Sequence, residues 1–341
     1  MPVSRAPANK SLRFSLIALG VFASATFLWL SFRNTDIAEI RTTLASANPY
    51  WVVPFLLLLF GFYWLKSRRW RDLLSPTRSL RSADLFPAVM IGYAGTAVLP
   101  MQMGELVRAF VVSRKQSMSY ALVLGSIGIE RVFDFLSVLA ILGVVLVAGE
   151  NIPQAMRMAG YVVATGCLIA LTLTTLLVTQ TEMILRFIRT AFGWLPKRFV
   201  QKTLEQMRQI SMGFQVLRHP QVLIAVAVNS LVQWLLMGGC ILFSLWAFDI
   251  DVPPTAAAMV LVATIIGVSL PTSPGYVGNI QLAFALALLP YGVSRESAIA
   301  ASIYYHILAY VSVVVTGFIF LHRYGYQLGK LRREATDSLE Q

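Results

Sequence analysis

Apolar segments of roughly 20 residues recur along this chain, and they constrain its fold more than any other feature. A helix of that length crosses the hydrocarbon layer of a membrane. Of the 341 residues, 57% are hydrophobic and only 13% are charged, whereas soluble domains are about 25% charged. An ordinary soluble enzyme, a disordered chain and a nucleic-acid-binding domain are therefore excluded. We expect an all-α polytopic membrane protein in which residues 1–341 form a single transmembrane domain.

Six segments are long and continuous enough to be full transmembrane helices. They are residues 14–32, 51–65, 120–148, 160–179, 221–247 and 296–321. A further segment, residues 182–219, is basic and has apolar residues at helical spacing. That pattern predicts an amphipathic helix on the cytoplasmic leaflet, where Lys and Arg meet anionic lipid heads. A helix packed beneath the bundle is the alternative.

Two other apolar stretches are interrupted by proline and glycine, within residues 84–112 and within residues 256–290. Proline removes a backbone donor and glycine permits unusual dihedral angles, so each stretch should be a broken helix. Inside a membrane, such backbone must be surrounded by protein or by a water-filled cavity. We therefore expect two broken re-entrant helical hairpins, with the breaks at Pro100, Gly104, Pro271, Pro274, Gly275 and Gly278.

The distribution of basic residues predicts the orientation. If each hairpin returns to the side it entered, 23 of the 28 Lys and Arg residues fall on the side of the N-terminus and 4 on the other side. The basic segment from Lys66 to Arg81 is counted among the 23, and Arg131 lies within a membrane segment. The positive-inside rule then places both termini in the cytoplasm. We expect a bacterial inner membrane protein.

In this arrangement, residues 84–148 and 256–321 form two units of opposite topology, each a hairpin followed by a full crossing. The units share a spacing, because Glu105 precedes Glu130 by 25 positions and Gln281 precedes His306 by 25 positions. Inverted repeats with broken helices are typical of many secondary transporters. Proline–glycine pairs and one shared spacing also arise by coincidence, so the inverted repeat is a hypothesis.

The strongest candidate site is the charged sequence from Glu130 to Asp134. Glu130 lies about 15 Å into its helix at 1.5 Å per residue, a depth at which charge is costly and marks a functional or paired residue. Arg131 and Asp134 are three residues apart and can pair. Arg108, on the returning limb of the first hairpin, is the natural partner of Glu130. Glu105, on the same limb, could meet Arg131.

Arg108 and Arg131 are the candidate residues for binding an anionic lipid head group. The planar arginine fork donates two parallel hydrogen bonds, which suits phosphate. Glu105, Glu130 and Asp134 would pair with these arginines in the empty state or carry a proton that couples to transport. The structural alternative is a charge network that fixes the broken hairpin to its neighbouring helix. The two interpretations are compatible.

The second half of the chain is less charged, and its candidate cavity residues are Gln281, Tyr305 and His306. His306 could titrate near neutrality, although a single histidine in a helix also serves as a structural residue. The sequence has no metal-ligand spacing, nucleophile–base arrangement or phosphate-binding glycine loop. We therefore expect no cofactor, no metal and no enzymatic activity.

Together these motifs resemble the flippase-like family defined by the membrane domain of lysylphosphatidylglycerol synthase, the multiple peptide resistance factor. The first signature of that family, a proline followed by Gly-Glu and an arginine, is similar to Pro100, Gly104, Glu105 and Arg108. The second, Glu-Arg followed by Asp in a helix, is similar to Glu130, Arg131 and Asp134. The third, a Pro-Gly-rich turn with a further glycine, is similar to Pro271, Pro274, Gly275 and Gly278. The likeness covers about residues 10–325.

The resemblance implies a domain that moves lipids with polar heads between leaflets. In the bifunctional synthases a cytoplasmic aminoacyltransferase domain follows the membrane part. This chain ends about 20 residues after its last crossing, so we expect that activity to be absent. Two positions depart from the family pattern. Gln281 stands where the family tends to have an acid, and His306 stands where an arginine is common.

We therefore expect a lipid flippase-like transporter of an anionic or glycosylated lipid. Its partners would be membrane lipids and not nucleic acid, and the sequence is compatible with a homo-oligomer. One alternative is a non-transporting membrane partner of a separate lipid-modifying or glycosyltransferase enzyme. The other is a proton-coupled transporter of small solutes. A laterally open cavity favours lipid, and a closed cavity that reaches only water favours a solute.

Overall fold

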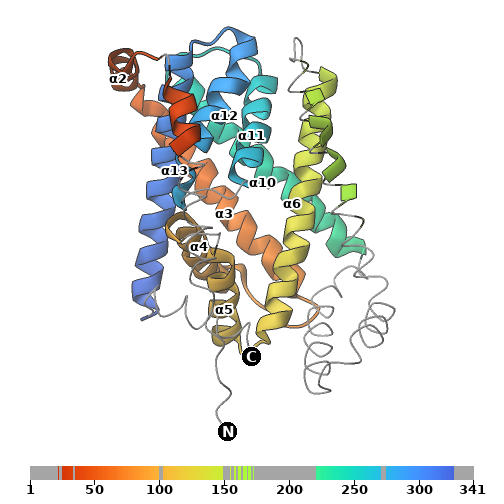
Figure 1. Cartoon of the computed structure of the whole chain (residues 1–341). Coiled ribbons are helices and arrows are strands. Elements are labelled where there is room, and N and C mark those ends of the chain that lie inside the picture. The colour runs from red at the N-terminus through yellow and green to blue at the C-terminus, as the bar shows by residue number, and fades with distance from the viewer. Residues whose placement is uncertain are drawn as a thin grey trace.

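The computed structural model describes residues 22, 25–33, 35–99, 103–148, 220–269 and 274–325, together with separate residues between 154 and 172. Within these residues the regular elements are all helical, which confirms the all-α prediction (Figure 1). The α-helices are α2 (Ile37–Ala45), α3 (Val52–Leu74), α4 (Ser82–Val98), α5 (Gly104–Gln116), α6 (Tyr120–Ala148), α10 (Pro220–Trp246), α11 (Pro254–Ser269), α12 (Asn279–Leu288) and α13 (Arg295–Arg323). Three 3-10 turns join them: η1 (Pro49–Trp51), η4 (Pro274–Tyr276) and η5 (Leu289–Tyr291).

Three described helical segments are long and apolar enough to cross a membrane: Pro49–Leu74, Pro220–Trp246 and Arg295–Arg323, with 26, 27 and 29 residues. Helix α6 has 29 residues, as many as the segment Arg295–Arg323, but it contains the charged sequence from Glu130 to Asp134. The chain is therefore an all-α membrane protein. The number of full crossings stays a prediction, because segments 14–32 and 160–179 lie partly, and 182–219 wholly, outside the described residues.

Helix α3 corrects one part of the sequence prediction. The crossing was expected to end at residue 65 and to be followed by a basic cytoplasmic loop from Lys66. The helix instead continues to Leu74, and Lys66 and Arg69 are buried, at 1% and 0% exposure. Burying a cation is tolerated where carboxylates compensate its lost hydration, and both side chains meet acids of α6. These two positive charges, and that of Arg108 at 1% exposure, were counted for the cytoplasmic side but lie inside the bundle.

The first helix break is observed where it was predicted, between the end of α4 and the start of α5 at Gly104. Pro100 itself lies outside the described residues. The two helices pack closely after the turn, because a Cβ atom at Gly104 would overlap the carbonyl oxygen of Gly92. A side chain at Gly104 would therefore push α5 away from α4.

The second break separates α11, of 16 residues, from α12, of 10 residues. Gly275 and Gly278 have φ angles of 80° and 91°, which glycine adopts without steric cost. Tyr276 between them also has a positive φ, of 57°, where a side chain is strained. Pro274 begins η4, and Pro271 is not among the described residues.

The helices are arranged so that the two breaks meet. In Figure 1, α6 and α13 run along opposite sides, α4 and α5 lie in the lower half, and α11 and α12 lie in the upper half. The turn η4 packs against α4, and a Cβ atom at Gly275 would lie 3.7 Å from the carbonyl oxygen of Ala97. Residues almost 180 positions apart thus bring both helix ends to the middle of the bundle.

Candidate functional site

Charged side chains from three helices meet inside the bundle, and we call this group the charged cluster. Its members are Lys66 and Arg69 of α3, Glu105 and Arg108 of α5, and Glu130, Arg131 and Asp134 of α6. These three helices approach closely because their buried apolar residues share one hydrophobic core. The structure therefore brings together all five charged residues that the sequence singled out, and it adds two more.

Glu130 and Asp134 form ion pairs with two basic residues of α3. Arg69 NH2 lies 2.7 Å from Glu130 Oε1, and Arg69 NH1 lies 2.7 Å from Asp134 Oδ1. Arg69 NH1 also donates to Ser230 Oγ of α10 at 2.8 Å. Lys66 Nζ lies 3.0 Å from Asp134 Oδ2 and 3.5 Å from Glu130 Oε1. Each of these two buried carboxylates therefore has two cations from α3 beside it.

Lys66 and Arg69 were missed as site residues because a basic segment after an apolar run is typical of a cytoplasmic loop. A signal was present in the sequence. The two residues are three positions apart, so they share one face of a helix. The apolar residues Trp70, Leu73 and Leu74 continue that helix beyond them, and all three are buried.

Arg108 confirms the pairing expected from the sequence. Its NH2 atom lies 3.1 Å from Glu130 Oε2 and 2.6 Å from Glu105 Oε2. The guanidinium also lies over the ring of Trp70, 4.5 Å from its centroid, an attractive cation–π arrangement. Trp70 is held in turn by a 2.9 Å hydrogen bond that its Nε1 donates to Ser126 Oγ. Arg108 is 1% exposed and is thus fixed on several sides.

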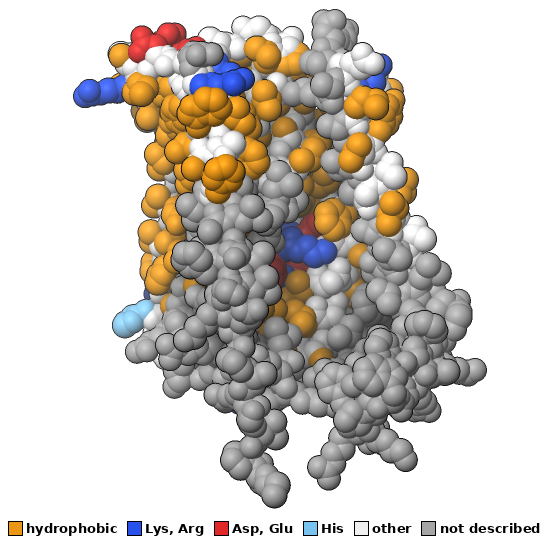
Figure 2. Space-filling view, viewed as in Figure 1, with side chains coloured by type: hydrophobic (Ala, Val, Ile, Leu, Met, Phe, Trp, Pro, Cys, Tyr) orange, Lys and Arg blue, Asp and Glu red, His pale blue; other side chains and the backbone are white. Residues whose placement is uncertain are grey.

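Arg131 is the accessible member of the cluster. It pairs with Glu105, as the sequence predicted, and its NH1 atom lies 3.5 Å from Asp134 Oδ2. Its side chain is 38% exposed, and that of Glu105 is 19% exposed. Figure 2 shows basic atoms beside acidic ones at mid-height of this face, next to hydrophobic side chains. The charged cluster therefore reaches the surface of the protein through the side chains of Arg131 and Glu105.

The charges of the cluster do not balance. Four cations face three carboxylates, so its formal charge is +1. Glu130 and Asp134 keep Lys66 and Arg69 as partners whatever Arg131 does. An anion that contacts Arg131 would therefore leave no buried carboxylate uncompensated. Such a site can accept a negatively charged group at low desolvation cost.

In the second half, the structure brings Gln281 and His306 together but not Tyr305. Gln281 Nε2 lies 3.3 Å from His306 Nδ1, and Gln281 Oε1 accepts a 2.8 Å hydrogen bond from the N–H of Gly278. The Tyr305 hydroxyl instead contacts Met237 Sδ at 3.1 Å. The two positions that depart from the family pattern thus form one polar contact that includes no carboxylate.

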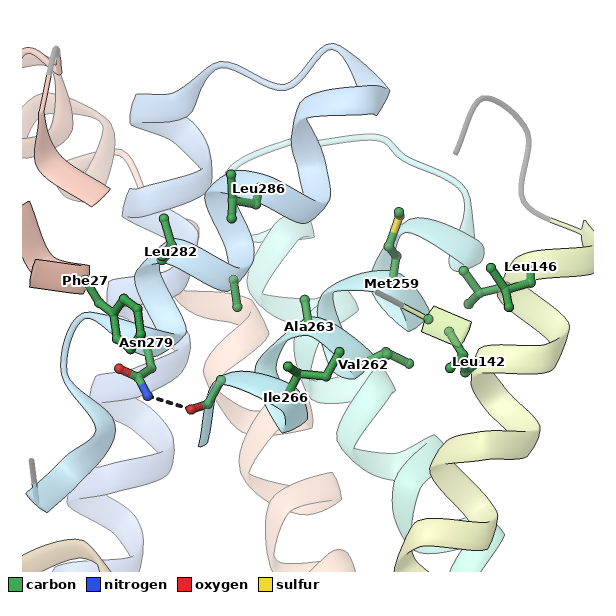
Figure 3. A pocket seen from close by; sticks show the side chains of 14 residues that line it. Phe27, Leu142, Leu146, Met259, Val262, Ala263, Ile266, Asn279, Leu282 and Leu286 are labelled. Atoms are coloured by element: carbon green, nitrogen blue, oxygen red, sulfur yellow. Dashed lines mark hydrogen bonds between the residues drawn. The ribbon is translucent and has the colours of Figure 1, made fainter. Parts of the chain in front are cut away.

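An apolar cavity of about 260 Å³ lies between α6, α11 and α12, apart from the charged cluster (Figure 3). Its walls include Leu142 and Leu146 of α6, Met259 and Ile266 of α11, and Leu282 and Leu286 of α12. The polar side chain of Asn279 lies at one edge and donates a 2.6 Å hydrogen bond to the carbonyl oxygen of Gly267. No local sequence pattern marks this cavity, because its lining comes from α6, α11 and α12 together with Phe27 and Gly160.

The acids of the charged cluster belong to the described part of the chain and pair with cations. There, no group of three or more His, Cys, Asp or Glu side chains is placed to hold a metal ion. The acids of the cluster contact arginine and lysine instead. The guanidinium groups of the charged cluster are hydrogen-bond donors of the kind that bind carboxylates and other anions.

A helical membrane bundle with two broken helix pairs and an internal charged cluster defines the class of this protein. The chain belongs to the family of the lysylphosphatidylglycerol synthase transmembrane region, which matches residues 17–317. The match covers both helix breaks and all seven residues of the charged cluster. The resemblance seen in the sequence motifs is therefore confirmed.

The chain is also similar to two individual curated proteins, at low sequence identity. The chain is 25% identical over 334 residues to the Glycosyltransferase AglD of Haloferax volcanii, a match that covers 88% of this chain and 53% of that protein. It is 22% identical over 237 residues to the UPF0104 membrane protein MJ1078 of Methanocaldococcus jannaschii, covering 66% of this chain and 92% of that protein. The chain thus spans about half the length of the first relative. No solved structure matches it.

Proposed function

We propose that this protein moves the head group of an anionic or glycosylated lipid between the two leaflets, with the charged cluster as its intramembrane binding site. The main observation in favour is the excess positive charge of the cluster, together with the 38% exposure of the Arg131 side chain. A charge inside a membrane protein is costly and marks a functional residue by default. A phosphate or other anionic group would compensate that excess.

In the proposed mechanism, the head group replaces Glu105 as the partner of Arg131. The planar guanidinium of Arg131 then donates to two oxygens of the anion. Glu105 keeps its contact with Arg108, 2.6 Å away, so no unpaired carboxylate is created. The hydrocarbon chains of the lipid stay in apolar surroundings while the head group is bound.

The arrangement of the helix breaks supports alternating exposure of this site. The pair α4–α5 lies in the lower half and the pair α11–α12 in the upper half (Figure 1). Their breaks meet near the middle of the bundle, where η4 packs on α4. This is the arrangement expected of an inverted repeat, in which one half rocks against the other around a central site.

The described charges support a cytoplasmic lower end, with both termini in the cytoplasm of a bacterial cell. The ends of α3, α5 and α13 meet there, because Arg78 donates to the carbonyl oxygen of Gln116 and Lys115 lies over the ring of Tyr324. Its exposed basic residues are Arg68, Arg78, Arg81, Arg114, Lys115 and Arg323. The opposite end carries the acids Asp36, Glu39, Asp249, Asp251 and Glu296 beside its arginines. This asymmetry follows the positive-inside rule.

The comparisons are in keeping with a lipid or a glycosylated lipid as the substrate. The family is named for a synthase of lysylphosphatidylglycerol, which is a lipid, and one relative is named a glycosyltransferase. The second name also favours another candidate function, a non-transporting membrane partner of a separate glycosyltransferase or lipid-modifying enzyme. In both cases this chain would bind the lipid and not catalyse a reaction.

The test is reconstitution of the full chain into liposomes with fluorescent phosphatidylglycerol or a fluorescent lipid-linked sugar. Arrival of the label in the outer leaflet is followed by chemical quenching. Arg131→Ala should slow translocation about tenfold or more, since a hydrogen bond to a charged group contributes about 1.5–3 kcal/mol. Arg131→Lys should be intermediate. Arg81→Ala, at an exposed ion pair with Asp84, is the matched control and should equal wild type.

Three results would contradict the transport proposal. One is equal translocation by wild type and Arg131→Ala. Another is no movement of either lipid, combined with activation of a co-reconstituted glycosyltransferase, which would establish the partner function. The third is uptake of a water-soluble anion driven by a pH gradient without movement of lipid, which would establish a proton-coupled solute transporter.

A further inference from the structure

We propose that the apolar cavity between α6, α11 and α12 binds one hydrocarbon chain of the lipid whose head group contacts Arg131. The inference rests on the proposed function and extends it from the head group to the tail. Nothing in the comparisons assigns a role to this cavity. Its occupant follows from its lining, its volume and its position relative to the charged cluster.

The lining suits a hydrocarbon chain and little else. The cavity walls on the three helices are mainly aliphatic, with Leu142, Met259 and Leu282 among them, and Asn279 and the aromatic ring of Phe27 complete the lining (Figure 3). The volume of about 260 Å³ exceeds that of an engineered aliphatic cavity of about 150 Å³, which stays dry and binds benzene. Water would find few hydrogen-bond partners there, whereas an alkyl segment would gain dispersion contacts with the walls.

The cavity and Arg131 lie on the same face of α6. Leu142 follows Arg131 by 11 positions, which is slightly more than three full turns at 3.6 residues per turn and about 16 Å along the axis. Phe135, one turn beyond Arg131, is 39% exposed, whereas Val138 and Leu142 further along the same face are 3% and 4% exposed, so this apolar face is accessible beside Arg131 and buried toward the cavity. A lipid with its head group at Arg131 could therefore lay its chain along α6 into the cavity.

The direction in which the hydrocarbon chain would point also agrees with a lipid that enters from the leaflet at the basic end of the bundle. Helix α6 begins at Tyr120, beside the basic end of α5, and runs from Arg131 toward Leu142 away from that end. A lipid in the leaflet at the basic end has its head group toward that end and its chains pointing away from it. The same orientation places the head group at Arg131 and one chain in the cavity, without inverting the molecule.

One side of the cavity reaches the surface of the protein. Leu286 of α12, which lines the cavity, is 46% exposed. Exposed apolar side chains of a membrane protein contact hydrocarbon. The cavity can thus be reached from the bilayer, as a lipid chain requires.

The experiment uses the full chain in phosphatidylglycerol vesicles that contain phosphatidylglycerol with a photoactivatable diazirine near the end of one acyl chain. After irradiation, cross-linked peptides are mapped by mass spectrometry. We expect cross-links at Met259 and Leu282 in the wild type. Ala263→Trp, which fills the cavity from α11, should abolish them. Cross-links at Val311, exposed on α13 at 51%, should be unchanged, and Val311→Trp is the matched control substitution.

Two cross-linking results would overturn the inference: cavity cross-links that persist in Ala263→Trp at the wild-type level, and a wild-type protein cross-linked at Val311 but not in the cavity. The second result would mean that another part of the chain or a second copy fills it. Chromatography and thermal unfolding show whether Ala263→Trp folds. Leu286→Trp, at the exposed mouth of the cavity, provides a second variant in which the core packing is kept.

Translocation measured on the same samples separates this inference from the proposed function. If the filled variants translocate the labelled lipid at the wild-type rate, the cavity is not the chain site and the flippase proposal stands. If the wild type moves no lipid but shows cavity cross-links that Ala263→Trp removes, the chain site stands and the flippase proposal fails. Loss of both translocation and cavity cross-links in the filled variants supports both.

Discussion

At the scale of single residues, the charged cluster separates structural cations from an accessible one. Arg69 makes two ion pairs of 2.7 Å and is 0% exposed. Arg131 is 38% exposed and lies 3.5 Å from Asp134. Removing one partner of a buried ion pair leaves an uncompensated charge, whereas exposed pairs contribute little. Arginine should therefore stabilise the fold at position 69 and act mainly on lipid translocation at position 131.

Substitution of each arginine by methionine tests this difference. Arg69→Met should lower the free energy of unfolding by about 3 kcal/mol, because it removes two buried ion pairs. Arg131→Met should change it by less than about 1 kcal/mol and should act on lipid translocation instead. Unfolding of the purified protein in detergent, by heat or by denaturant, measures both. Equal losses of stability would show that Arg131 is as structural as Arg69.

At the scale of elements, glycine permits a close crossing of α13 over α4. A Cβ atom at Gly317 of α13 would overlap the Cβ atom of Ala94 and would lie 2.6 Å from the carbonyl oxygen of Met90, both on α4. The backbone of α13 therefore packs directly against α4 at Gly317. Small residues at such contacts are typical of membrane helices, where close packing replaces the hydrophobic effect.

The prediction at this crossing compares two glycines. Gly317→Ala should destabilise the protein by about 1–3 kcal/mol, because the overpacked helices must separate. Gly128→Ala on α6, where no atom lies within 4 Å of the added Cβ, should be neutral or stabilising by up to about 1 kcal/mol. Thermal unfolding in detergent distinguishes them. A loss of stability in Gly128→Ala equal to that in Gly317→Ala would refute the close crossing.

Helix α12 begins at the second break with the help of Gln281. Its Oε1 atom accepts the buried N–H of Gly278 at 2.8 Å, a donor without a partner within the helix. Gln281→Leu should therefore lower the free energy of unfolding by about 1–3 kcal/mol, the cost of a buried donor left unpaired. Gln281→Glu keeps the acceptor and should retain more stability at neutral pH. If both variants unfold alike, the hydrogen bond is not what holds the start of α12.

At the scale of the whole molecule, the charges define two different ends. The lower end gathers exposed basic residues at the ends of α3, α5 and α13, and the upper end mixes acids with arginines. The orientation depends on the side on which the basic residues are retained. It no longer depends on Lys66 and Arg69, because these two charges are inside the bundle.

Cysteine labelling tests the orientation. In a variant with Cys167 and Cys240 replaced by serine, Ser79→Cys lies in the exposed loop at the basic end and Ser46→Cys is exposed at the opposite end. A membrane-impermeant thiol reagent should label Ser46→Cys in bacterial cells with a permeabilised outer membrane. Ser79→Cys should react only after the inner membrane is opened. The reverse pattern would invert the orientation and the direction assigned to the lipid chain.

The sequence predicted the helix breaks and three ion pairs of the cluster for the same physical reason. Both depend on local properties of the chain: proline and glycine limit the backbone where they stand, and a charge deep in an apolar helix requires a partner. It was wrong about Lys66 and Arg69, because whether a basic residue continues a helix depends on acids 60 or more positions away. The roles proposed for Arg108, Arg131 and the second-half residues stay predictions.

The sequence by itself thus determined that the chain is a helical membrane protein, where two of its helices break and which acids pair inside the helix bundle. These features follow from hydrophobicity, backbone freedom and the cost of burying charge, which act over a few residues. Only the tertiary structure decided that α3 supplies two cations, that the two breaks meet, and that an apolar cavity lies on the Arg131 face of α6. These features arise from packing between distant segments, and no local pattern encodes such packing.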